Sequence, residues 1–235
     1  MALYTIADLH LSFSEDKPMN VFGDIWDNYE EKLKENWTNK IKENDLVVLP
    51  GDFSWSMQLE NTYKDFEYLN NLPGKKILLK GNHDYWWGTI TKMKNYVAEN
   101  DFNTITFLQN DSYEFENYII AGTRGWVLND IENEKIINRE LERLKLSLQD
   151  AAEKNVDGSK EIIVFMHYPP VTYQALNSLE ILRFVEIMKQ YGVKRCYYGH
   201  LHSESIKTAY EGQTHGIEFK LVSADYLKFD PLKID

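Results

Sequence analysis

Short, continuous apolar runs alternate with segments of helical periodicity along most of this chain, and that alternation limits the fold more than any other feature. Continuous apolar runs of about four to eight residues are typical of strands covered on both faces, as in parallel sheets. Five runs are of this kind: Leu3 to Ala7, DLVVLP (45–50), KKILLK (75–80), EIIVFMH (161–167) and KRCYYGH (194–200). Strands that alternate with helices in this way predict an α/β fold.

The segments between these runs carry apolar residues at helical spacing. In the first, Tyr29, Leu33, Trp37 and Ile41 recur every four residues and so share one face of a helix. Further helices are predicted around Leu59–Phe66, around Ile90–Val97, from about Glu132 to Glu153 and from about Leu176 to Tyr191.

Two parts of the chain depart from this alternation. TITFLQ (104–109), SYEFE (112–116) and YIIAGT (118–123) follow one another closely, with a hairpin turn at Glu116–Asn117. The tail from Ser203 to Leu227 predicts two or three antiparallel strands around a turn at Glu211–Gly212. No Pro/Gly/Ser-rich linker, repeat or low-complexity tract interrupts the sequence. Residues 1–235 are therefore predicted to form a single α/β domain with a mixed sheet.

Composition argues against several classes of protein. No apolar stretch among the 235 residues approaches the length of a membrane span, and the N-terminal MALYTIADLH lacks the basic segment of a signal peptide. The only cysteine, Cys196, has no partner for a disulfide, which predicts a reducing, cytoplasmic location. With a net charge of −11 and no basic stripe, the chain is not expected to bind nucleic acid. An anionic protein that handles an anionic substrate needs local positive charge, which bound metal ions would supply.

Polar side chains follow each of the five apolar runs at its carboxyl end. They are Asp8 and His10, then Asp52, then Asn82, His83 and Asp84, then His167, and finally His200 and His202. Because the carboxyl ends of parallel strands lie along one edge of a sheet, we expect these residues to meet in one patch. They include five of the six histidines, and the sixth, His215, is interpreted as a solvent-facing loop residue.

The spacing and chemistry of these residues indicate a metal site. Asp8 and His10 lie two residues apart, as do His200 and His202, and in extended backbone this spacing points both side chains to one side. Carboxylate, imidazole and amide ligands without a thiolate suit Mn²⁺, Fe or Zn²⁺ better than a structural zinc site. The ligands are too many for one tetrahedral ion, which predicts two divalent ions that share a bridging carboxylate.

Each motif also has a simpler explanation when it is taken alone. An aspartate at a strand end commonly caps a helix or forms a turn, and Gly-Asp or Gly-Asn-His suits turn geometry. His167 could be an ordinary hydrogen-bonded histidine, and a surface strand could carry the Gly-His-Leu-His sequence. The metal site is favoured because five such motifs occur in order, each at the end of an apolar strand.

The order D-x-H, GD, GNH-[DE], H and GH-x-H resembles the calcineurin-like metallophosphoesterase superfamily over nearly the whole chain. The resemblance implies a four-layer sandwich of two mixed β-sheets flanked by helices, with two divalent ions at the carboxyl strand ends. It implies that Asp8, His10 and His202 hold the first ion and that Asn82, His167 and His200 hold the second. Asp52 would bridge the two.

The same resemblance implies a metal-dependent phosphoesterase. By this resemblance, two ions about 3.5–4 Å apart would hold a bridging hydroxide that would attack phosphorus in line. His83 would be the general acid that protonates the leaving group. Asp84 would either orient His83 or cap the helix that follows.

One departure from the family concerns the branch that acts on phosphoserine and phosphothreonine proteins. That branch carries G-D-x-x-D-R-G, whereas this chain reads GDFSWSM, with Trp55 and Ser56 in place of the aspartate and arginine. The departure argues against serine/threonine-type protein phosphatase activity. Arg124 could bind the substrate phosphate instead, with a structural ion pair as the alternative.

Aromatic residues lie within a few positions of the motifs and could pack on the substrate, although aromatic clusters more commonly belong to the core. Of these, Trp86 is predicted to contact substrate, with Trp87 as the alternative. The leading hypothesis is a phosphoesterase for a small or nucleotide-like phosphoester. Its rivals are a protein phosphatase, a nuclease of the same superfamily, and a non-catalytic scaffold of the same fold. The sequence does not predict an oligomeric state.

Overall fold

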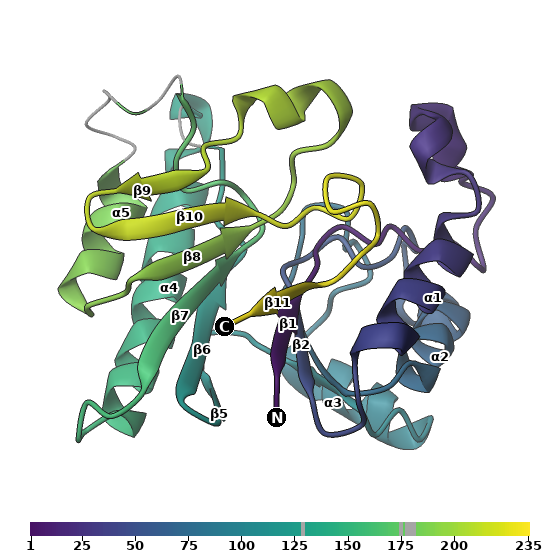
Figure 1. The fold of residues 1–235 in the computed structure, drawn as a ribbon, viewed down its shortest axis with the longest axis horizontal. Helices are drawn as coiled ribbons and strands as arrows, with labels where there is room; N and C mark the ends of the chain where they lie inside the picture. The colour runs from purple at the N-terminus through teal and green to yellow at the C-terminus, as the bar shows by residue number, and fades with distance from the viewer. Residues whose placement is uncertain (128–129, 174–175, 177–181) are drawn as a thin grey trace.

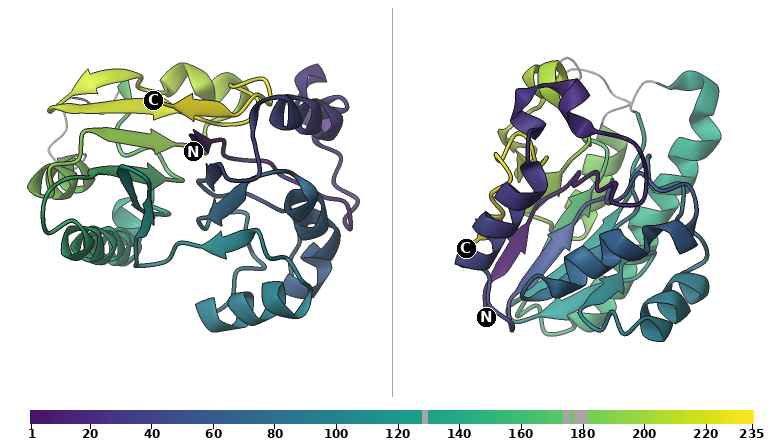
Figure 2. Two further views of the ribbon diagram at one scale, coloured as in Figure 1. Left: turned by 60° about the horizontal axis from the view of Figure 1, so that its bottom comes forward. Right: turned by 90° about the vertical axis from the view of Figure 1, so that its right-hand side faces the viewer.

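Two β-sheets face each other across the centre of the molecule, and helices cover the outer face of each (Figure 1; Figure 2). The computed structural model describes residues 1–127, 130–173, 176 and 182–235. The layers confirm the predicted α/β class and the four-layer sandwich of two mixed sheets.

The first sheet has the strand order β11-β1-β2-β3-β4. Its strands are β1 (Leu3–Thr5), β2 (Leu46–Leu49), β3 (Lys75–Leu78), β4 (Ile105–Phe107) and β11 (Leu232–Ile234). Strands β1 to β4 are parallel, whereas β11 pairs antiparallel with β1. The carboxyl ends of β1, β2 and β3 therefore lie at one edge of this sheet.

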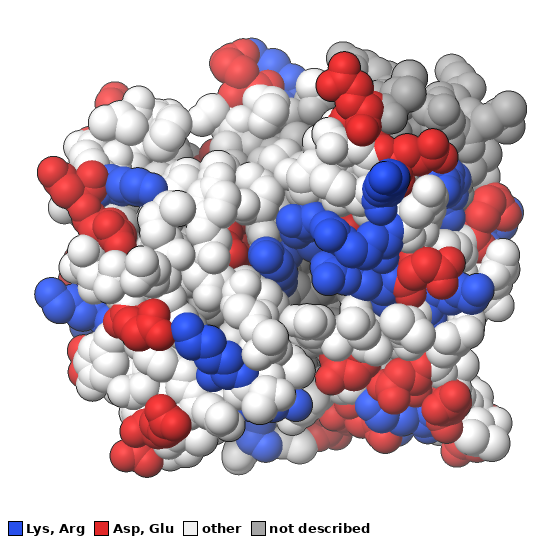
Figure 3. All heavy atoms as spheres, turned by 180° about the vertical axis from the view of Figure 1, so that it is seen from behind, with Lys and Arg blue, Asp and Glu red and all other residues white. Residues whose placement is uncertain are grey.

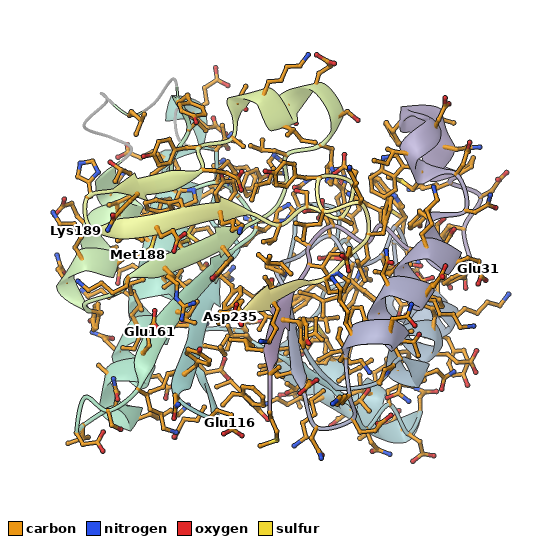
Figure 4. All side chains as sticks on the ribbon, in the orientation of Figure 1. Glu31, Glu116, Glu161, Met188, Lys189 and Asp235 are labelled. Atoms are coloured by element: carbon orange, nitrogen blue, oxygen red, sulfur yellow. The ribbon has the colours of Figure 1, made fainter. Side chains whose placement is uncertain are left out.

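The second sheet has the strand order β5-β6-β7-β8-β10-β9. Its strands are β5 (Tyr113–Phe115), β6 (Tyr118–Thr123), β7 (Glu161–Met166), β8 (Arg195–Tyr198), β9 (Gly212–Thr214) and β10 (Ile217–Leu221). The four inner strands are parallel, and β5 and β9 are antiparallel edges. The β5–β6 hairpin turns at Glu116–Asn117 as predicted, and Glu116 marks the end of the sheet away from the carboxyl ends (Figure 4).

Within the described residues, five α-helices form the outer layers. They are α1 (Tyr29–Lys40), α2 (Tyr63–Asn71), α3 (Ile90–Glu99), α4 (Glu134–Lys154) and α5 (Leu182–Gln190). The first three pack on the first sheet through residues such as Trp37 and Phe66, and the last two pack on the second through residues such as Leu144. Among the described residues, no helix is long and apolar enough to span a membrane.

Apolar side chains also fill the space between the two sheets (Figure 4). Val48 and Ile77 of the first sheet join Ile163 and Phe165 of the second in one buried cluster. Burial on both faces explains why these strands read as continuous apolar runs.

The structure corrects the predicted tail. Ser203–Thr208 is a 3-10 helix, and the hairpin turn between β9 and β10 lies at His215–Gly216 rather than at Glu211–Gly212. His215 and Gly216 have positive φ angles of 53° and 79°, which two-residue hairpin turns favour. His215 is exposed, as predicted. The part of the predicted helix Leu176–Tyr191 at residues 177–181 lies outside the described residues.

Candidate metal centre

The polar residues at the ends of β1, β2, β3, β7 and β8 meet where the two sheets come together. The side chains of Asp8, Asp52 and His167 are almost completely buried there. The sequence-based expectation that these strand ends would converge is therefore met.

One group of side chains consists of Asp8, His10 and His202, with one potential ligand atom of each within 4.8 Å of the others. The Nε2 atoms of His10 and His202 lie 3.2 Å apart. His202 Nε2 also lies 3.3 Å from Asp8 Oδ1. Three donor atoms thus face one small volume.

A second group consists of Asp52, His167 and His200, again with ligand atoms within 4.8 Å of one another. His200 Nδ1 and His167 Nε2 lie 3.2 Å apart. Asn82 joins this group, because its Oδ1 lies 2.6 Å from His167 Nε2. Its amide oxygen is therefore placed where a further ligand to the same ion is predicted.

Asp52 lies between the two groups. Its Oδ2 is 3.5 Å from His167 Nε2 in the second group and 3.8 Å from His10 Nε2 in the first. The carboxylate is buried, with a residue exposure of 1%. A single oxygen that faces both groups is the geometry that a bridging ligand requires.

Four of these residues have left-handed backbone conformations, which are uncommon outside glycine. The φ angles are 62° at Asp8, 48° at His10, 52° at Asp52 and 74° at His200. Strain of this kind concentrates at functional sites. These angles also correct the expectation of extended backbone at Asp8 and His10, whose side chains converge through left-handed backbone instead. His200 and His202 belong to different groups, as the family resemblance implies.

Two glycines allow the motif loops to approach the carboxylates. A Cβ atom at Gly81 would lie 2.1 Å from Asp52 Oδ1, and one at Gly199 would lie 2.3 Å from Asp8 Oδ2. Both distances are far below van der Waals contact. The space is used by hydrogen bonds from main-chain N–H groups, from His83 to Asp52 Oδ1 at 2.8 Å and from His200 to Asp8 Oδ2 at 2.9 Å.

Outer hydrogen bonds fix two of the imidazole rings. His167 Nδ1 lies 3.1 Å from the carbonyl oxygen of Pro50, and His202 Nδ1 lies 3.0 Å from Asp225 Oδ1. Contacts of this kind leave the Nε2 atom of each ring for the centre. Asp225 was not among the predicted residues. It follows β10, so the rule that polar residues gather at parallel strand ends identifies it once β10 is placed beside β8.

The charges of the site suit a cation. Burial and the neighbouring carboxylates of Asp84 and Asp8 raise the pKa of Asp52 well above its ordinary value. Burial lowers the pKa of His10 and His167 well below theirs, so both imidazoles are neutral and can donate a lone pair. Clustered carboxylates that repel one another beside neutral imidazoles form a donor set that divalent ions fit.

His202 differs from the other imidazoles. Burial acts to lower its pKa, but Asp8 and Asp225 outweigh burial and raise the pKa to about 10. A metal ion at the first group would have to displace this proton.

His83 lies beside the first group without belonging to it. Its ring centroid is 5.7 Å from that of His10, and its side chain is half-buried. Trp55 packs against it with a centroid distance of 4.4 Å and stacks on His10 at 4.8 Å. Trp55 therefore covers His83 at the position where the phosphoprotein branch carries an aspartate.

Asp84 was predicted either to orient His83 or to cap the helix that follows. In the described part of the chain it does neither. Its Oδ1 accepts hydrogen bonds from the main-chain N–H groups of Phe53 and Ser54 and from Trp86 Nε1, at 2.9, 3.3 and 3.0 Å. Its Oδ2 accepts from the main-chain N–H groups of Asp52 and Gly81, at 2.9 and 2.7 Å. Helix α3 is capped by Thr89 instead. Asp84 thus ties the loop that carries Asp52 to the loop that carries Asn82.

The predicted substrate contact at Trp86 is wrong. Trp86 is only 3% exposed and packs against Phe53 and Phe66 in the core, with its indole N–H bound to Asp84. The adjacent Trp87 is half-buried and lines a pocket. The two neighbours face opposite environments, and the sequence could not tell which one is in the core.

Arg124 follows β6 and forms an ion pair with the buried Glu140, with Nη2 3.4 Å from Oε1. This contact matches the structural alternative for Arg124. Its Nε, however, is buried and has no hydrogen-bond partner among the described residues. The ion pair therefore leaves part of the guanidinium available.

Solved structures with this fold span almost the whole chain. A protein of unknown function, AQ665, from Aquifex aeolicus is 17% identical with a TM-score of 0.53, covering 99% of this chain and 95% of that one. The phosphopantetheinyl hydrolase PptH from Mycobacterium tuberculosis is 13% identical with a TM-score of 0.51 and the same coverage. GAP50, the anchor in the inner membrane complex of Plasmodium, is 12% identical with a TM-score of 0.53, covering 96% and 72%. Identities this low show a shared fold only.

A family model gives the assignment that these structures do not. No curated protein matches the chain. The model for calcineurin-like phosphoesterase matches residues 1–204, which include every candidate ligand described above. By this match, and in keeping with the paired ligand groups at its strand ends, the protein belongs to the calcineurin-like phosphoesterase family.

Proposed function

We propose that this protein is a metal-dependent phosphoesterase that uses two divalent ions, of Mn, Fe or Zn, on a small or nucleotide-like phosphoester. The observation that carries the proposal is the position of Asp52 Oδ2 between two complete ligand groups. Asp8, His10 and His202 would hold one ion, Asn82, His167 and His200 the other, and Asp52 both. Such a pair of ions lowers the pKa of bound water and offsets charge on the phosphoryl oxygens.

His83 supplies the remaining step, which is protonation of the departing oxygen. Its imidazole belongs to neither ligand group and borders the first, so it can face a substrate held there. Its Nδ1 has no hydrogen-bond partner among the described residues. Burial lowers the pKa of His83, so its protonated form is the stronger acid but makes up a smaller fraction at neutral pH.

Two alternatives are tested beside this proposal. Serine/threonine-type protein phosphatase activity is disfavoured by Trp55, which occupies the place of that branch's aspartate and covers His83. The second alternative is a non-catalytic scaffold, because GAP50, which is described as an anchor, has the same fold. Every expected ligand position is filled here, which favours catalysis.

The test combines metal analysis with a substrate panel. Protein loaded with Mn²⁺ is assayed on nitrophenyl mono- and diesters, nucleotides and phosphopeptides, with Asp52→Asn as the variant. Asp24→Asn is the control, since it removes the same charge from an exposed residue that belongs to neither ligand group. In the control we expect about two bound ions per chain and hydrolysis. In Asp52→Asn we expect the bound metal and the hydrolysis to be lost.

Full occupancy and turnover in Asp52→Asn would refute the shared-carboxylate assignment. A marked preference for phosphopeptides would favour the protein phosphatase. Occupied sites without hydrolysis of any ester would favour the scaffold.

We also propose that the protein works in the cytoplasm. The single Cys196 is buried in β8 and is free, so the chain forms no disulfide of its own. A reducing compartment agrees with that chemistry.

A further inference from the structure

A pocket of about 120 Å³ lies between the two sheets, lined by side chains that the proposed hydrolysis does not use. Its polar lining consists mainly of Lys80, Trp87, Gln109, Arg124, Glu140 and Arg143. Seen from behind, Lys and Arg side chains gather around a hollow on this face (Figure 3). This volume is enough for several water molecules or one phosphate-sized group.

The pocket carries more positive than negative charge. Its one carboxylate, Glu140, is fully buried and already contacts Arg143 Nη1 at 3.0 Å and Arg124 Nη2 at 3.4 Å. The other carboxylate oxygen accepts a hydrogen bond from Thr123 Oγ1 at 2.8 Å. Arg139, outside the pocket, lies 3.5 Å from the same carboxylate. One negative charge therefore faces several guanidinium groups in a chain whose net charge is −11.

Lys80 adds to this excess. No carboxylate of the described residues forms an ion pair with it, although ion pairs are present for its neighbours Arg124 and Arg143. Lys80 lines the same pocket as Arg124 and Arg143, and the like charges of the three side chains repel one another. Cations that repel one another in a half-buried pocket favour an anion as their partner.

The guanidinium of Arg124 is held in place. It lies over the ring of Trp126, with Cζ 4.6 Å from the ring centroid, and is tied to Glu140 on one side. Its buried Nε lacks a hydrogen-bond partner among the described residues. A buried donor without a partner is unfavourable, and an oxygen of a bound anion would satisfy it.

The pocket adjoins the metal centre. Lys80 lies two residues before Asn82, at the end of β3. The carbonyl oxygen of Arg124 accepts a hydrogen bond from the main-chain N–H of Tyr168, at 2.8 Å. The ring of Tyr168 packs on His200 with a centroid distance of 4.2 Å. Lys80 and Tyr168 therefore connect the pocket to the second ligand group.

We propose that this pocket, through Lys80, Arg124 and Arg143, binds a second phosphate of the substrate, separate from the ester that is hydrolysed. Guanidinium groups bind phosphate oxygens in pairs, as they do carboxylate oxygens, and a phosphate carries more negative charge than a single carboxylate to offset the three cations of this pocket. The proposal rests on the proposed function, because it names the substrate class as small phosphoesters with two phosphate groups.

The first experiment measures binding without catalysis. Protein stripped of metal and dialysed free of chelator is titrated with adenosine 3′,5′-bisphosphate, with inorganic phosphate and with malonate. We expect binding of the two phosphate ligands to weaken by about 10- to 100-fold in Lys80→Met, as for a lost charged hydrogen bond. Lys145→Met is the control, since it removes one lysine from an exposed position of α4. Arg143→Gln is a second variant, in case Lys80→Met does not fold.

If Lys80→Met, Arg143→Gln and the control bind the phosphate ligands with equal affinity, the pocket is not a phosphate site. If malonate binds as tightly as inorganic phosphate, the assignment to phosphate is wrong.

The second experiment measures KM with Mn²⁺-loaded protein on adenosine 3′,5′-bisphosphate and on nitrophenyl phosphate. We expect Lys80→Met to raise KM for the bisphosphate about 10-fold more than for nitrophenyl phosphate. Equal changes on both substrates would contradict a separate phosphate site. If no ester is hydrolysed while the bisphosphate still binds through Lys80, the proposed function fails and the anion pocket stands.

Discussion

Asp84 connects the two loops that carry Asp52 and Asn82, and Asp84→Asn tests that connection with almost no change in size. The substitution converts one carboxylate oxygen into an NH₂ group. If the remaining oxygen keeps the three donors at the Oδ1 position, the NH₂ group faces the main-chain N–H groups of Asp52 and Gly81. These two buried donors then lose their acceptor and meet another donor.

The magnitude follows from those two hydrogen bonds. A buried donor left without a partner costs about 1–3 kcal/mol, so the free energy of unfolding should fall by about 2–6 kcal/mol. That is a large part of the roughly 5–15 kcal/mol that stabilises a typical domain. The two donors belong to residues at the centre, so metal occupancy should fall as well.

The assay is equilibrium unfolding in urea, followed by circular dichroism, together with elemental analysis of protein loaded with Mn²⁺. Asp111→Asn is the matched control. Asp111 Oδ1 accepts one hydrogen bond, from the main-chain N–H of Gln109 at 2.8 Å, and an amide oxygen can accept it equally well. We expect the control to change stability by less than about 1 kcal/mol. If Asp84→Asn is no less stable than Asp111→Asn, the role of Asp84 as the link between the loops is wrong.

Three further predictions concern other residues. His83→Ala should keep the metal content and slow hydrolysis of esters with poor leaving groups by about 10²–10⁴-fold; unchanged turnover on an alkyl phosphate would remove His83 from the mechanism. Gly81→Ala should lower metal occupancy, because its Cβ would lie 2.1 Å from Asp52 Oδ1, and full occupancy by elemental analysis would contradict this. Burial lowers the pKa of Lys76 to about 7, so the unfolded chain binds more protons between pH 7 and about 10, and stability should rise with pH over that range. Urea unfolding at pH 7 and pH 9 should show this rise in the wild type and not in Lys76→Met; an equal rise in both would exclude Lys76 as its source.

The positions of the candidate ligands are predictable from sequence because parallel strands buried on both faces are the easiest strands to recognise. Polar side chains begin where each apolar strand leaves the core. Because the strands are parallel, their carboxyl ends lie at one edge. Asp8, Asp52 and His167 are found in this way even when it is not known that their strands are divided between two sheets.

Other features depend on long-range contacts that no local pattern contains. The burial of Trp86 rather than Trp87 is decided by Phe53 and Phe66, which are far away in sequence. The donors to Asp84 come from two separate loops, so its role cannot be read from GNHD alone. The pairing of β11 with β1 joins the two ends of the chain and has no signature in either strand.

Each ligand group takes side chains from both halves of the sequence. Asp8 and His10 follow a strand of the first sheet, whereas their partner His202 follows a strand of the second, and the group around Asp52 is divided in the same way. Neither sheet can assemble a group by itself. An ion bound there would link the first sheet to the second. A small separation of the two sheets would therefore release the metal before any helix or strand unfolds.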